Sequence, residues 1–156
     1  MHSGVLINQI DDWLIERAIG NSEVQTVVEG CAERLFGAGI RVARMHISYR
    51  TLHPLFSYQS ITWTRDTGLE VEDHAHQSSD LTHGGWDGSP LKYMVENQLP
   101  TMRRRLDGAD ELLDFPILEE FASRGMTDYL AFAIAFDDWG PGALPTADGM
   151  VVSWTS

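Results

Sequence analysis

Apolar residues recur at helical spacing through the first quarter of the chain. This pattern predicts an amphipathic helix over residues 6–19, whose apolar stripe comprises Leu6, Ile10, Trp13, Leu14 and Ala18. A second helix is predicted to begin near Ser22, whose spacing from Gln25 fits a capping box, and to end at the glycines of residues 37–39. Cys31 falls within its apolar stripe, so we expect a core thiol rather than a reactive one.

The spacing then changes to the alternation that is typical of strands. Three consecutive strands are predicted, over residues 40–52, 56–64 and 69–76. The first two form a hairpin that turns at His53 and Pro54. The third has charged groups on one face, which commonly protects the edge of a sheet, and these groups are Glu70, Glu72, His74 and His76.

The second half of the chain alternates between short helices and strands. Ser89 and Pro90 are expected to open a helix that runs to residue 98. A short strand over 99–106 carries Arg103–Arg105, which the acidic connection 109–114 is expected to balance; the alternative is that this run attracts an acidic ligand. A last strand is predicted over 150–154, antiparallel to the strand that precedes it.

Residues 115–136 form the clearest unit, a helix, a turn and a strand. Asp114 is expected to cap this helix, Pro116 suits its first turn, and Gly125 suits a left-handed C-terminal cap. The strand, 127–136, is apolar on both faces, which predicts a central position in the sheet. We expect its large side chains, Leu130, Phe132, Ile134 and Phe136, to face the layer of residues 77–125, and its alanines and Tyr129 to face the N-terminal helices.

Composition narrows the fold and the partners. The chain has 156 residues, 43% of them hydrophobic, which fits one domain of α+β class with helices flanking an antiparallel sheet. The net charge of −12 argues against nucleic acid and against an anionic membrane surface. The longest apolar run, Tyr129 to Phe136, is far shorter than a membrane span, and the start shows no secretory signal. The single cysteine fits a reducing cytoplasm.

Three short motifs resemble one protein family. They are Leu52-His53-Pro54, Ser89-Pro90-Leu91 and the segment 125–129, Gly-Met-Thr-Asp-Tyr. Together with the order of elements, they resemble the GAF-like N-terminal regulatory region of bacterial class III adenylate/guanylate cyclases, over residues 13–154. The resemblance implies a single GAF/PAS-like sensor domain over 1–156, with N-terminal helices on one sheet face and a helix and loop layer on the other.

The same resemblance carries expectations about activity and assembly. In that family a C-terminal helix and a cyclase domain follow, and this chain ends on a strand before both. We therefore expect a piece of a longer cyclase, without catalytic activity of its own. Regulatory domains of this kind commonly form homodimers through their terminal helices, so a homodimer is expected.

The layer of residues 77–125 would enclose a ligand pocket in a GAF-like fold. Arg44 and His46, on the mixed face of the first strand, are expected to face this layer, with Trp86 and Tyr93 as aromatic walls. Asp128 is a candidate for pairing with a cation or hydrogen-bonding a ligand. The alternative is structural: Arg44 and Asp128 form an ion pair, and His46 makes a core contact. No cofactor is identified.

Histidines suggest a second kind of site. His74 and His76 lie two residues apart on one strand face, about 7 Å apart along the strand, and His83 follows. Such a set suits zinc or nickel, although the same residues suit a solvated edge face. Three functions therefore stay open: a small-molecule sensor that regulates a nucleotide cyclase, a free-standing metal-dependent enzyme, and a dimerisation module without a ligand.

Overall fold

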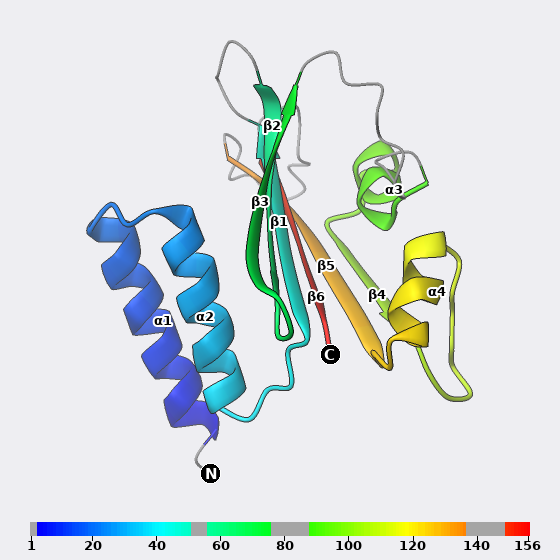
Figure 1. The fold of residues 1–156 in the computed structure, drawn as a ribbon, viewed down its shortest axis with the longest axis horizontal. Helices are drawn as coiled ribbons and strands as arrows, with labels where there is room; N and C mark the ends of the chain where they lie inside the picture. Colours follow the sequence, from blue (N-terminus) through cyan, green and yellow to red (C-terminus); the bar gives the residue numbers. More distant parts are fainter. Residues whose placement is uncertain (1–2, 51–55, 76–87, 137–148) are drawn as a thin grey trace.

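The computed structural model describes residues 3–50, 56–75, 88–136 and 149–156 (Figure 1). The order of elements follows the prediction. The elements are α1 (Ser3–Ile19), α2 (Val24–Gly37), β1 (Arg44–Arg50), β2 (Phe56–Thr64), β3 (Gly68–Ala75), α3 (Pro90–Glu96), β4 (Thr101–Arg105), α4 (Pro116–Ser123), β5 (Asp128–Ala135) and β6 (Gly149–Thr155). The first strand begins later than the predicted residue 40, because the amide of Val42 bonds to the carbonyl of Ile40 and turns the chain there.

The strands form one antiparallel sheet of α+β class, in the order β3-β2-β1-β6-β5-β4. The predicted pairing of the first two strands and the predicted edge position of the third are confirmed. The prediction that β5 is central is wrong, because β1 and β6 occupy the middle and β5 lies next to the edge strand β4.

The two N-terminal helices lie on one face of the sheet. Helix α2 packs on β2 and β3, and Val28 and Ala32 share a core with Met45, Ile61 and Trp63. Helix α1 lies outside α2, which separates it from the sheet (Figure 1). Among the described helices, none is long and apolar enough to cross a lipid bilayer.

Helices α3 and α4 lie on the opposite face, over β4 and β5 (Figure 1). Their core includes Met94, Leu118 and Phe121, which pack with Tyr129 and Ala131 of β5. This reverses the predicted assignment of the two faces of β5. The alanine and tyrosine face meets α3 and α4, because the Phe121 ring stacks on the Tyr129 ring with centroids 6.3 Å apart.

The large side chains of β5 therefore point to the side of the N-terminal helices. Helix α2 covers the other half of that face, so Ile134 keeps 39% of its surface exposed and Phe136, just after the strand, keeps 51%. Phe132 packs edge-on against Trp154 of β6, with ring centroids 5.7 Å apart. Although β5 is apolar on both faces, none of the described helices covers its part of this face.

The ends of the helices partly follow the predicted signals. Ser89 caps α3 by accepting a hydrogen bond from the amide of Lys92, and Gly125 has a φ of 83° after α4. Two predicted caps are wrong. Phe115 is the cap residue of α4, since the Asp114 carboxylate binds Arg104 instead, and Glu23 rather than Ser22 precedes α2.

Candidate functional site

The sheet face beneath α3 and α4 is apolar on one half and polar on the other. On β1, Met45 packs against α2, so its neighbours Arg44 and His46 point to the opposite face, as predicted. The register carries this alternation across the sheet, where Ser48 pairs with Ser60 and Ser60 with Glu72. We call this half the polar face; it comprises Arg44, His46, Ser48, Arg50, Tyr58, Ser60, Thr62, Thr64, Glu70 and Glu72.

Arg44 lies where the polar face meets the core under α4. Its side chain is partly buried, and its guanidinium carbon lies 5.2 Å from the centroid of the Phe121 ring. Burial lowers the pKa of Arg44 to about 10, an effect that nearby Tyr129, Glu120 and Glu72 offset only in part. The group therefore stays positive at neutral pH. Within the described residues, no carboxylate lies within ion-pair distance of it and no acceptor takes its hydrogen bonds.

His46 is tied to the neighbouring strand. Its Nδ1 and the Thr62 hydroxyl share a hydrogen bond of 2.8 Å, between residues that the register places opposite each other. Either atom can be the donor, depending on the tautomer of the ring. The bond fixes the ring orientation beside Arg44, two residues away on the same face.

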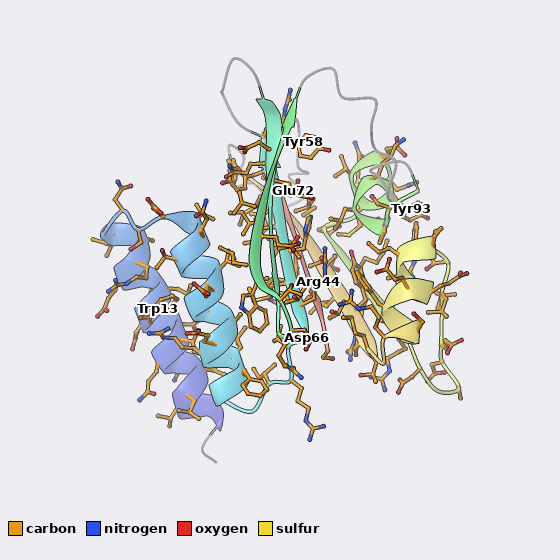
Figure 2. All side chains as sticks on the ribbon, in the orientation of Figure 1. Trp13, Arg44, Tyr58, Asp66, Glu72 and Tyr93 are labelled. Atoms are coloured by element: carbon orange, nitrogen blue, oxygen red, sulfur yellow. The ribbon has the colours of Figure 1, made fainter. Side chains whose placement is uncertain are left out.

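The outer strands of the polar face supply hydroxyls and acids. The Ser60 hydroxyl donates to the Glu72 carboxylate over 3.5 Å, and burial together with the Glu72 charge raises the pKa of Tyr58. Figure 2 shows Glu72 and Arg44 on the side of the sheet that faces α3 and α4. The sequence of β2 shows that polar and apolar residues alternate along the strand. Only the register shows that the polar residues of β2 lie beside Arg44.

A second group of polar side chains lies deeper, beneath α4. Arg44, Thr155 and Tyr129 are aligned across β1, β6 and β5. Tyr129 is 2% exposed; burial raises its pKa to about 12, although a hydrogen bond to Ser153 opposes this rise. The Thr155 hydroxyl is buried and has no hydrogen-bond partner among the described residues. Polar atoms thus continue from the polar face into the core.

Asp128 lies apart from this group. It is the neighbour of Tyr129 along β5 and faces the other side of the sheet, where its carboxylate accepts hydrogen bonds from Arg103 and Arg105. The structural alternative, an ion pair between Asp128 and Arg44, is therefore wrong, because one step along a strand reverses the face. The pairing of Arg104 with Asp114 does confirm that the acidic connection balances part of the arginine run.

Of the two predicted aromatic walls, the structure describes only Tyr93. Tyr93 lies on α3 with 44% of its surface exposed, and its ring meets Phe115 edge-on at 5.6 Å between centroids. In Figure 2 its side chain lies well away from Arg44. Trp86 lies outside the described residues.

The histidine set cannot be placed from the described residues. His74 belongs to β3, but its side chain lies outside them, as do His76 and His83. Elsewhere in the described chain, no group of three His, Cys, Asp or Glu residues has an arrangement suited to a metal ion. Cys31 packs beside the α2 core, and burial raises the pKa of its thiol, which fits a packing role.

Arg44, the hydrogen-bonded His46 and a row of hydroxyls thus lie together on the polar face, beside the Phe121 ring. Comparison of the chain with protein-family models, curated proteins and solved structures finds no match. The resemblance to cyclase regulatory domains therefore remains a prediction from the short motifs alone.

Proposed function

We propose that this chain is a regulatory domain that binds a small molecule on the polar face. The observation that carries this proposal is Arg44, a partly buried cation without a carboxylate partner among the described residues. Moving a charge partly out of water costs free energy, and the fold does not need a charged side chain at this position. A ligand that accepts hydrogen bonds from the guanidinium would explain why a charged residue is present here.

The surroundings of Arg44 support binding rather than a purely structural role. His46 is fixed by Thr62, and hydroxyl groups lie along the neighbouring strand. Ligand sites commonly combine an apolar wall with a few placed polar groups. Here Phe121 supplies an apolar wall beside the polar face.

A thermal-shift screen against a chemically diverse panel of metabolites tests the proposal. A ligand at a hundred times its dissociation constant stabilises the folded state by about 2.7 kcal/mol, which raises the melting temperature measurably. We expect at least one compound to stabilise the wild type but not Arg44→Met. Stabilisers that act equally on both proteins would place binding elsewhere, and a panel without any stabiliser would contradict the proposal.

We further propose, on the strength of the motif resemblance, that the domain regulates a C-terminal nucleotide cyclase in the cytoplasm. Binding would shift the population between two arrangements of the domain, and the ligand's preference for one of them would set the output. Deleting residues 1–156 from the parent protein and measuring cyclic-nucleotide formation tests this part. Unchanged activity and unchanged regulation would contradict it.

A second candidate function is homodimerisation, favoured by the exposed apolar side chains of α1. Ile15 is 58% exposed and Ile19 is 81% exposed, one helical turn apart. Sedimentation of Ile15→Asp/Ile19→Asp should show a monomer where the wild type shows a dimer. Leu112→Asp, which changes a 49% exposed leucine in another part of the chain, is the control and should leave the wild-type state unchanged.

A further inference from the structure

Three arginines of the described chain stack on an aromatic ring, which allows a direct comparison. The guanidinium of Arg34 lies 3.9 Å from the centroid of the Trp13 ring, and that of Arg65 lies 4.9 Å from the centroid of Phe36. Both also donate to a backbone carbonyl: Arg34 to Gly30 at 3.0 Å, and Arg65 to Val42 at 2.5 Å. Arg44 makes the ring contact only, and no described residue accepts a hydrogen bond from it.

This difference identifies the part of the Arg44 guanidinium that is available to a ligand. A guanidinium is planar, so an aromatic ring occupies its face and leaves the N–H groups at its edge. The edge presents parallel N–H donors that match the two oxygens of a carboxylate. In Arg34 and Arg65 a backbone carbonyl uses this edge, whereas in Arg44 the described protein leaves it unused.

The charges around Arg44 limit the charge of the partner. Arg124 is the other nearby cation, and Glu120 and Glu72 are the nearby anions that act on Arg44 electrostatically. Arg124 is paired with Glu120 at 3.6 Å, and Glu72 accepts from Ser60. Two positive and two negative groups thus balance before any ligand is present, so the surroundings offer no excess positive charge to a ligand that carries a second negative charge.

We propose that the ligand of the polar face is a small organic carboxylate, whose carboxyl group binds the edge of Arg44 while Phe121 holds the face. This inference rests on the proposed function, since it names the chemical class of the ligand for that site. A phosphate is the competing anion; its second charge and the acids nearby make it the poorer partner.

Nuclear magnetic resonance of the arginine Nε–H groups tests the class directly. Sodium acetate, sodium benzoate and sodium pyruvate are titrated separately into the folded domain, against sodium chloride and sodium phosphate at matched ionic strength. At least one carboxylate should shift the Arg44 signal with saturation, and chloride and phosphate should not. The signals of Arg34 and Arg65 should not shift, because these two guanidinium groups already donate to backbone carbonyls.

Variants of Arg44 measure how much the planar, forked geometry of its guanidinium contributes to carboxylate affinity. Arg44→Lys keeps the charge but loses the fork, so the best carboxylate should bind about 10- to 100-fold more weakly, as expected for lost charge-assisted hydrogen bonds. Arg65→Lys is the matched control and should bind like the wild type. If Arg44→Lys does not fold by circular dichroism, the comparison of the three wild-type arginine signals decides.

The outcomes separate the ligand class from the proposed function. Saturation by phosphate, equal shifts of all three arginines, or no saturable carboxylate would overturn the carboxylate assignment. The function itself would still stand if the metabolite panel yields a non-carboxylate stabiliser that depends on Arg44. Both proposals fail together if no compound of either set acts on Arg44.

Discussion

The guanidinium of Arg44 and the ring of Phe121 meet at 5.2 Å, joining the middle of the sheet to α4. A cation over a ring contributes about 0.5–2 kcal/mol, and the partial burial of the charge, which lowers the pKa of Arg44, acts against this contribution. We therefore regard Arg44 as a residue retained at some cost to stability. The contact between Arg44 and Phe121 therefore matters both for the stability of the fold and for the proposed ligand site.

Replacing Arg44 by methionine should not destabilise the protein. Arg44→Met keeps an unbranched apolar side chain against Phe121 and removes the desolvated charge, so the free energy of unfolding should be unchanged or higher by about 1 kcal/mol. Urea denaturation at pH 7 measures it. A loss larger than about 2 kcal/mol would show that Arg44 stabilises the fold.

Tyr129 should make stability fall at alkaline pH. Its folded pKa of about 12 lies above the unfolded value of about 10, so the stabilisation is complete below pH 10 and is lost as pH rises towards 12. Between pH 8 and pH 11 the wild type should lose about 1.4 kcal/mol relative to Tyr129→Phe. Chemical denaturation of both proteins across this range measures the difference, and parallel curves would contradict it.

Gly30 should be required for α1 to pack on α2. A Cβ atom at Gly30 would lie 2.7 Å from the Trp13 ring, whereas one at Gly37, at the end of the same helix, meets nothing within 4 Å. Gly30→Ala should therefore cost about 1–3 kcal/mol despite the better helix propensity of alanine. Gly37→Ala should be neutral or stabilising. Denaturation and amide exchange in α1 measure the effect, and equal behaviour of the two variants would refute the packing.

Asp128 should contribute to stability and not to binding. Hydrogen bonds from Arg103 and Arg105 lower the pKa of its carboxyl, so its contribution is present above the unfolded pKa and is lost as pH falls through the folded one. Asp128→Asn should lower the urea midpoint slightly at pH 7, and less at high salt or pH 3. Its ligand affinity should match that of the wild type, because Asp128 lies on the other face. A loss of affinity would contradict this placement.

Local signals in the sequence were enough to predict most elements. Pro116 and Gly125 mark the ends of α4, Ser89 marks the start of α3, and alternation identifies β2 with its observed ends. These features depend on backbone preferences within a few residues, which a single sequence expresses directly.

Features that depend on distant partners were predicted incorrectly or only in part. Asp114 suits a cap, but Arg104 from the neighbouring strand takes its carboxylate. The two faces of β5 are both apolar, so periodicity gives no orientation, and the stacking of Tyr129 on Phe121 decides it. The direction of Arg44 followed from alternation along β1, whereas its lack of a carboxylate partner required the register of the sheet.

Native mass spectrometry of three purified proteins, the wild type, Arg44→Met and Arg65→Met, tests whether Arg44 holds the ligand. We expect a retained or added small carboxylate on the wild type and on Arg65→Met, and a mass without it for Arg44→Met at the same ligand concentration. Equal occupancy of all three proteins, or loss from Arg65→Met alone, would contradict the assignment of the ligand site to Arg44.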